Sequence, residues 1–187
     1  FRKQYGFEKW PDFDADLFER IYNDDSQERD FDFKLMGFDL NHHAVEAARA
    51  NAKNAGVADI VEVEQRDIRD FQQPEGKAIM ITNPPYGERL KPEDLYEVYS
   101  ILGTQLKRNF LGGEAHVISY KEDVFREIGM RPSLKTPLYN GPMDCEVRKY
   151  VIFDGKMKDF RAEGGEVKTQ SELRMMGEKK RFKRERG

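Results

Sequence analysis

The segment Ala78-Ile79-Met80-Ile81-Thr82-Asn83-Pro84-Pro85-Tyr86 carries the clearest information about how this chain folds. Residues 78–82 form a short apolar run, which is typical of a strand buried on both faces of a parallel sheet. The two prolines then keep the backbone extended and prevent a helix from following directly. An amide and an aromatic ring therefore stand at fixed positions just after a predicted buried strand.

Strand and helix patterns alternate on both sides of this segment. Further strands are predicted near residues 34–38, 60–65, 115–119, 135–139 and 147–153, and helices near 14–23, 41–55, 92–110 and 122–128. Asn41 is predicted as an N-cap, Gly56 as the residue after a helix end, and Asn140-Gly141-Pro142 as a turn between the last two strands. This order predicts an α/β fold with a mostly parallel, Rossmann-like sheet and an antiparallel C-terminal hairpin.

Three of the predicted strands end in polar residues, namely Asp39, Asp67 and Asn83. Ligands of such sheets bind beyond the carboxyl ends of the strands, where an acidic residue can accept hydrogen bonds from both hydroxyls of a ribose. Asp39 fits this role, although a turn or capping aspartate is equally compatible with the sequence. Asp67 can accept a hydrogen bond from an adenine amino group, or it is an ordinary loop aspartate.

The Asn83 turn has a more specific chemistry. An exocyclic amine of a nucleobase is a poor nucleophile because its lone pair is delocalised into the ring. The Asn83 side-chain oxygen and the Pro84 carbonyl can each accept one N–H of such an amine, which localises the lone pair and orients it toward an electrophilic methyl group. Tyr86 can stack on an extruded base. The alternative is a rigid turn with a buried tyrosine.

Composition and charge limit the class of protein. The chain has 187 residues, 38% of them hydrophobic, and no apolar run approaches the ~20 residues that a membrane-spanning helix needs. Its one cysteine, Cys145, excludes an internal disulfide and favours the cytoplasm. No metal site is expected, since His42 and His43 are adjacent in sequence and His116 falls in a predicted strand. Cys145 is interpreted as a buried structural thiol.

The charge is unevenly distributed along the chain. Residues 156–187 contain 11 basic and 6 acidic residues, whereas residues 1–155 contain 21 basic and 29 acidic ones. We therefore predict a main region over 1–155, which the resemblance described below identifies as part of a catalytic domain, and a basic C-terminal extension over 156–187. The run Lys179-Lys180-Arg181-Phe182-Lys183-Arg184-Glu185-Arg186 can neutralise phosphates, or it is a solvated tail.

Several segments together resemble a known family. The stretches at residues 38–57, 66–71 and 81–90 resemble S-adenosylmethionine-dependent methyltransferases that modify amino groups of nucleobases. FEKW at residues 7–10, NPPYGERL at 83–90 and LYNGPMDC at 138–145 further resemble the bacterial 23S ribosomal RNA guanine-N2-methyltransferases, in which an RNA-binding THUMP domain precedes the catalytic domain.

The resemblance implies a cofactor and its contacts. The cofactor would be S-adenosyl-L-methionine, with Asp39 and the neighbouring Leu40 at its ribose and Asp67 with Ile68 at its adenine. Asn83 would contact both the cofactor and the base. Transfer would be a direct in-line displacement in rRNA processing, without a metal or a covalent enzyme intermediate.

The resemblance also implies how the substrate is held. Asn83, Pro84 and Tyr86 would hold the target base as catalytic residues, with Pro85 fixing the turn beside it. Asn140-Gly141 is interpreted as a turn first and a substrate contact second. The partner would be 23S ribosomal RNA, free or in a large-subunit assembly intermediate.

One feature of the family is absent from the sequence. The family's first strand ends in a glycine-rich loop against the methionine part of the cofactor, whereas Gly112-Gly113 precedes a later strand and is interpreted as an ordinary loop. We therefore expect the chain to be the C-terminal portion of a catalytic domain, completed by a preceding segment or another chain that supplies a central strand. A continuous sheet built from these residues alone would contradict this expectation.

Two other functions remain open from the residues. An adenine amino-methyltransferase acting on DNA or RNA would use the same Asn83-Pro84-Pro85-Tyr86 turn, because the turn recognises an amine and a ring face. A non-catalytic RNA-docking module would keep the fold without binding the cofactor.

Overall fold

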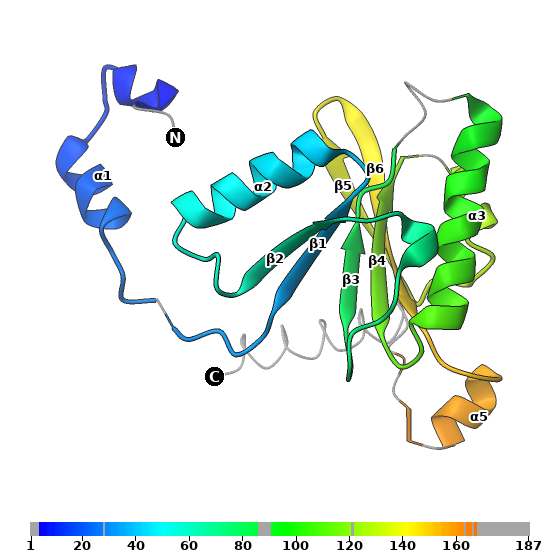
Figure 1. The fold of residues 1–187 in the computed structure, drawn as a ribbon. Coiled ribbons are helices and arrows are strands. Elements are labelled where there is room, and N and C mark those ends of the chain that lie inside the picture. Colours follow the sequence, from blue (N-terminus) through cyan, green and yellow to red (C-terminus); the bar gives the residue numbers. More distant parts are fainter. Residues whose placement is uncertain are drawn as a thin grey trace, which may run out of the picture. The chain divides into compact units, whose positions relative to one another are not determined.

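The computed structural model describes residues 4–27, 29–85, 91–120, 122–162, 164–165 and 167 (Figure 1). Internal contacts divide it into two units, one within Phe1–Gly37 and His43–Glu64, the other within Phe38–His42 and Gln65–Gly187. The elements are η1 Gly6–Lys9, α1 Ala15–Tyr22, β1 Leu35–Asp39, α2 His42–Asn54, β2 Val61–Gln65, η2 Ile68–Asp70, β3 Ile79–Thr82, α3 Pro92–Asn109, β4 Glu114–Ser119, α4 Glu122–Glu127, β5 Leu134–Asn140, β6 Met143–Val151 and α5 Met157–Ala162. The predicted α/β class and order of elements are confirmed.

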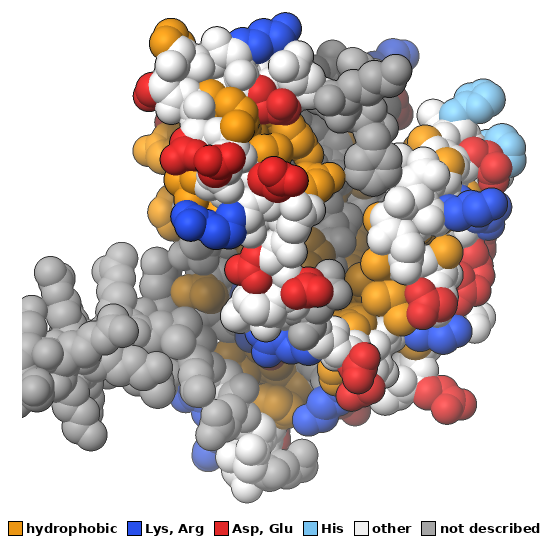
Figure 2. Space-filling model, turned by 90° about the vertical axis from the view of Figure 1, so that its left-hand side faces the viewer, with side chains coloured by type: hydrophobic (Ala, Val, Ile, Leu, Met, Phe, Trp, Pro, Cys, Tyr) orange, Lys and Arg blue, Asp and Glu red, His pale blue; other side chains and the backbone are white. Residues whose placement is uncertain are grey.

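The first unit begins with an aromatic cluster around α1. Asp14 caps this helix, its carboxylate accepting the Leu17 N–H at 2.8 Å. Phe18 on the inner side packs against the rings of Tyr5, Phe7 and Phe13, while α1 contains no buried residue. In the space-filling view, hydrophobic side chains reach the surface among acidic ones (Figure 2).

β1 and β2 form a two-stranded sheet. Leu35 donates its N–H to the Ile60 carbonyl at 2.8 Å, and Arg66 donates to the Asp39 carbonyl at 3.1 Å, so the two strands run parallel. The helix α2 between them ends before Gly56, whose φ of +72° confirms the predicted glycine after the helix end.

The second unit contains a four-stranded sheet in the order β3-β4-β6-β5. β3 pairs with β4 in parallel, and β6 pairs antiparallel with both β4 and β5. The core lies between this sheet and the helices α3 and α4, which follow β3 and β4 in the chain (Figure 1). Its most buried side chains are Leu95, Tyr99, Leu106, Phe110, Ala115, Val117, Val124, Phe125, Ile128 and Tyr150.

Two predicted details of this sheet are confirmed. Asn140 pairs with Met143, and Gly141 has a φ of +59°, which with Pro142 at the next position fits a type II′ hairpin turn. Gly113 lies so close to Phe110 that a Cβ atom there would be 2.5 Å from the ring, and its carbonyl accepts the Ile152 N–H at 3.0 Å. The Gly112-Gly113 pair is thus an ordinary packed loop.

The predicted burial of β3 on both faces is wrong in this structure. Met80 packs against the core, but Ile79 and Ile81 are 67% and 75% exposed. The register pairs Ile79 with Glu114 and Ile81 with His116, so these side chains share the face opposite α3 and α4. Helices of this unit cover one face of β3, and nothing among the described residues buries the other.

The described strands do not form one continuous sheet. No ladder joins the sheet of β1 and β2 to that of β3, β4, β6 and β5 among the residues that the structure describes. Within the predicted extension, α5 begins at Met157, and Phe160 stacks on Phe153 with ring centroids 4.6 Å apart. In the described part of the chain, none of the helices is long and apolar enough to cross a membrane.

Candidate active site at the strand ends

The turn after β1 presents the first predicted site residues, Asp39 and Leu40. The Asp39 carboxylate is exposed, and its Oδ1 accepts the Asn41 N–H at 2.7 Å. Gln65 donates its Nε2–H to the Leu40 carbonyl at 2.9 Å, which ties the turn to the end of β2. Asp39 is therefore a turn residue, and its carboxylate keeps further lone pairs for a ligand. The Leu40 side chain is 63% exposed beside it.

The loop after β2 presents Asp67 and Ile68. Asp67 caps η2, its Oδ1 accepting the Arg69 N–H at 2.8 Å and its Oδ2 the Arg69 Nη1–H at 2.9 Å. Arg69 also approaches Glu97 of α3 at 3.4 Å, and its carbonyl accepts a hydrogen bond from Gln105 of α3 at 2.8 Å. The loop that carries Asp67 is thus attached to α3.

Apolar packing connects these loops to β3. Phe38, Ile68 and Met80 all pack, partly buried, against the core of the second unit. Phe38 precedes Asp39, Ile68 follows Asp67, and Met80 lies within the strand that ends before Asn83. The Arg66 guanidinium lies 4.7 Å from the centre of the Phe38 ring. One apolar cluster therefore anchors all three strand ends that the sequence singled out.

Asn83 follows β3 directly, at the carboxyl end of the parallel pair β3–β4. Asn83 and Pro85 are exposed and Pro84 is partly buried, so the turn is accessible to a ligand. Tyr86 lies outside the described residues, and its role in base stacking remains a prediction. The structure places Asn83 in the same unit as Asp39 and Asp67.

Other chemically active side chains lie elsewhere. Lys149 contacts Glu114 at 2.6 Å, with His116 3.9 Å from the same carboxylate, toward the start of β4. Burial lowers the pKa of His116. Cys145 is 4% exposed, as expected for a structural thiol. No cluster of three or more potential metal ligands occurs among the described residues.

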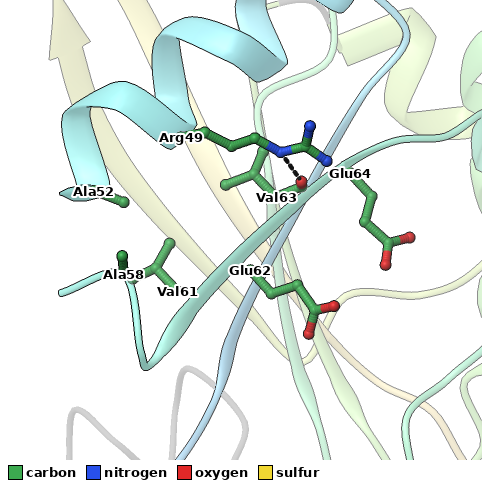
Figure 3. A pocket seen from close by; sticks show the side chains of 7 residues that line it. All are labelled: Arg49, Ala52, Ala58, Val61, Glu62, Val63 and Glu64. Carbon is green, nitrogen blue, oxygen red and sulfur yellow. Dashed lines mark hydrogen bonds between the residues drawn. The ribbon is translucent and has the colours of Figure 1, made fainter.

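A hollow of about 310 Å³ lies in the first unit, between α2 and β2. Arg49 donates to the Val63 carbonyl at 2.8 Å across it, and Figure 3 shows Glu62 and Glu64 pointing away from the helix. Its other lining residues are Ala52, Ala58 and Val61. None of the predicted site residues lines this hollow, and its two carboxylates do not converge on a ligand position.

Sequence reasoning missed the residues that hold the site loops. Gln65, Arg69 and Gln105 fix the loops after β1 and β2 through the contacts described above. Arg69 carried a usable signal, because a basic residue two positions after a strand-end aspartate can fold back onto its carboxylate. Gln105 carried none, since its contact depends on how α3 packs.

The chain is similar in sequence to a family of known proteins. Residues 5–149 match the family model described as RMKL-like, methyltransferase domain. Relatives include ribosomal RNA large subunit methyltransferase K/L of Photobacterium profundum, 35% identical over 91% of this chain and 25% of that protein, and its namesake in Aliivibrio fischeri, 34% identical over 81% and 23%.

A solved structure extends this likeness to the fold. The methyltransferase SMU.472, crystallised with SAH, matches with a TM-score of 0.66 and 28% identity over 82% of this chain and 41% of that one. The fold is that of the Rossmann-like class I methyltransferases. The chain spans about a quarter of the length of the two curated relatives.

Proposed function

Because the chain belongs to the family of RMKL-like methyltransferase domains, we propose that the complete protein methylates the exocyclic N2 amine of a guanine in 23S ribosomal RNA. The observation that carries the proposal is the family match over residues 5–149, which includes the Asn83-Pro84-Pro85 turn after β3. The names of the relatives support ribosomal RNA as the substrate class. Because the chain spans a quarter of them, an RNA-binding THUMP domain elsewhere in the protein belongs to the proposal.

The cofactor of this reaction is S-adenosyl-L-methionine, which when bound supplies an electrophilic methyl group. The residues at the strand ends fit its nucleoside half. Asp39 offers an exposed carboxylate to the two ribose hydroxyls, with the exposed Leu40 as an apolar contact. Asp67, held by Arg69, offers its remaining lone pairs to the adenine amine, and Ile68 offers apolar surface. The SAH bound by SMU.472, which is the demethylated form of this cofactor, supports the choice.

The base is held by the turn after β3. The Asn83 Oδ1 and the Pro84 carbonyl accept the two N–H bonds of the target amine, so its lone pair is localised on nitrogen and oriented. The turn needs no titrating base, because the amine releases its extra proton to water after methylation. Tyr86 stacks on the base in this proposal, and Pro85 keeps the turn extended.

A further segment completes the domain. β3 pairs only with β4, and β1 only with β2, among the described residues. Parallel sheets are normally buried, and open strand edges expose unpaired N–H and C=O groups. A strand from a segment N-terminal to this chain, or from another chain, pairs with these edges and carries the glycine-rich loop for the methionine half of the cofactor.

The region 156–187 serves RNA binding in this proposal. Its excess of five positive charges can neutralise phosphates of ribosomal RNA, whereas residues 1–155 are acidic overall. The basic run 179–186 lies outside the described residues. The protein acts in the cytoplasm on free 23S RNA or on an assembly intermediate of the large subunit.

Nucleoside mass spectrometry tests the proposal. Ribosomal RNA from cells with and without the gene is digested and its methylated positions are mapped. Loss of one N2-methylguanosine from large-subunit RNA is expected. Loss of a methyladenosine would keep the chemistry and change the base. Unchanged ribosomal RNA, together with no binding of S-adenosyl-L-methionine by the complete protein, would favour the non-catalytic docking module.

The variant Asn83→Ala tests the role of the amide. In the complete protein its kcat is expected to fall about 10³-fold, because the amine loses one of its two oriented acceptors. The dissociation constant for S-adenosyl-L-methionine, measured by calorimetry, stays within a few-fold. Asn51→Ala, an exposed asparagine of α2, is the matched control with unchanged kcat. An equally severe loss of cofactor binding in Asn83→Ala would show that the amide serves the cofactor.

A further inference from the structure

The hairpin of β5 and β6 reaches past the end of its neighbouring strand. β4 ends at Ser119, which pairs with Glu146, while β5 and β6 remain paired out to Asn140 and Met143. Because β6 runs antiparallel to β4, and β4 runs parallel to β3, this overhang lies on the side where β3 ends before Asn83. The hairpin tip therefore rises at the same edge of the sheet as the proposed base-binding turn.

Tyr139 lies on this overhang and has no packing role. Its side chain is 80% exposed, the largest exposure among the large hydrophobic side chains of the described residues. It pairs in register with Asp144, two residues and about 7 Å beyond Glu146. The neighbouring Leu138 is partly buried and its register partner Cys145 is 4% exposed. The hairpin is therefore packed at this level, and Tyr139 is exposed because its side chain points away from that packing.

The hairpin fixes the backbone that carries this ring. Seven register pairs join β5 to β6, from Leu134 with Lys149 to Asn140 with Met143. The tight Gly141-Pro142 turn closes the end. Because the backbone is fixed, only the two side-chain torsions of Tyr139 are restricted when the ring binds a flat ligand.

Strand order sets the distance from the target base. β5 is three strand positions from β3, which corresponds to about 14 Å across the sheet. Tyr139 is thus out of reach of the amine that Asn83 holds, but it is close enough for a base that flanks the target in the same RNA strand.

The charges around the ring favour a base over a phosphate. Asp144 lies opposite Tyr139, and Glu146 accepts a hydrogen bond from Arg148 at 2.6 Å. A carboxylate beside the ring repels the phosphate backbone, whereas stacking on a nucleobase needs only the π-face and tolerates any base. We propose that Tyr139 is a stacking platform for a nucleobase flanking the target guanine, an inference that rests on the proposed function.

Kinetics of the complete protein test this assignment. With unmodified 23S RNA transcribed in vitro, Tyr139→Ala is expected to raise the KM for RNA about ten-fold, and Tyr139→Phe to stay within two-fold, because the ring is kept. The dissociation constant for S-adenosyl-L-methionine stays unchanged in both. Phe33→Ala, which removes a 72% exposed ring before β1, is the matched control with wild-type KM. A Tyr139→Ala enzyme with wild-type KM would overturn the inference while leaving the proposed function intact.

A binding measurement removes the dependence on turnover. Fluorescence anisotropy with a labelled single-stranded RNA containing guanine is expected to show the same ten-fold loss for Tyr139→Ala and none for Tyr139→Phe. An unchanged affinity overturns the platform whether or not the protein methylates RNA. Loss of a co-purifying protein from Tyr139→Ala, with RNA affinity unchanged, would assign the tip to a protein partner instead and equally overturn it.

Discussion

β3 and β4 are neighbouring parallel strands, yet their sequences and surroundings differ. β4 alternates small or apolar residues, such as Ala115 and Val117 at 0% exposure, with the partly exposed Glu114 and His116. β3 reads Ile-Met-Ile-Thr without such alternation, and its Ile79 and Ile81 are 67% and 75% exposed. Polar residues of β4 suit its less covered face, whereas β3 has apolar residues on both faces. The sequence of β3 thus requires a cover that the described residues do not provide.

This difference bears on the site because Asn83 stands at the end of the less covered strand. β4 is fixed at both of its edges, by a ladder to β3 and a ladder to β6. Among the described residues, β3 is held by one ladder, to β4, and by Met80 in the core. The proposed central strand would pair with the open edge of β3 and would thereby fix the turn that holds the base. The same strand would carry the glycine-rich loop for the cofactor.

The largest effect is expected at Gly103 of α3, one of the two helices that cover one face of the sheet in the second unit. A Cβ atom at this position would lie 2.2 Å from the Ile128 carbonyl oxygen, so α3 and the end of α4 would have to separate. Gly103→Ala is expected to lower the free energy of unfolding by about 3 kcal/mol. This steric cost exceeds the gain in helix propensity from glycine to alanine, which is roughly 0.5–1 kcal/mol. Urea unfolding measures the change, with the exposed Ser100→Ala of the same helix as control. A Gly103→Ala chain as stable as wild type would show that α3 and α4 pack less closely.

The next effect compares the two strands directly. Val117→Ala should cost about 2 kcal/mol because the side chain is 0% exposed, whereas Ile81→Ala in this chain should cost less than about 0.5 kcal/mol. In the complete protein the Ile81→Ala cost should rise to about 2 kcal/mol, since the proposed segment would bury this face. Urea unfolding of wild type and both variants, in this chain and in the complete protein, gives the four differences in unfolding free energy. An Ile81→Ala cost that stays small in the complete protein would contradict the proposed cover.

Most elements of the fold could be predicted from the sequence. Helix and strand positions, the glycine after α2 and the Asn140-Gly141-Pro142 turn follow from local patterns. They are confirmed, except that β6 begins at Met143 and not near residue 147. The apolar run of β3 indicated a strand correctly, but burial depends on which layers are present. A pattern within one strand carries no information on which other elements cover its two faces.

The site residues divide in the same way. Polar residues at strand ends could be found from sequence, because strand ends are local features, and Asp39, Asp67 and Asn83 do end or follow strands. The dual use of Asp39 as turn acceptor and exposed carboxylate, and the Arg69 bridge from Asp67 to Glu97, depend on packing between elements. Ligand contacts of these residues remain predictions.

The smallest effect concerns the charged network on the covered face. Arg148, paired in register with Val117, is 4% exposed, bonds Glu146 at 2.6 Å and Glu122, and stacks 4.0 Å from the Phe125 ring centre. The hydrogen bond from Arg148 lowers the pKa of the Glu122 carboxyl. A depressed carboxyl pKa stabilises the fold above the ordinary value of about 4.3, and this stability is lost as the pH falls through the lowered value.

Urea unfolding between pH 6 and 3 therefore tests whether this network is formed. Because Glu122 is largely exposed, the contribution is small, and it should appear only as extra loss of stability in the acidic part of this range. Arg148→Met should remove that acidic slope while keeping apolar contact with Phe125, and Glu122→Gln should remove it as well. Arg108→Met, at an exposed position of α3, should retain it. Identical acidic slopes in wild type and Arg148→Met would mean that the Arg148–Glu122 bond does not persist in solution. Apolar packing alone would then distinguish the sheet face under α3 and α4 from the opposite face, which carries Ile79 and Ile81.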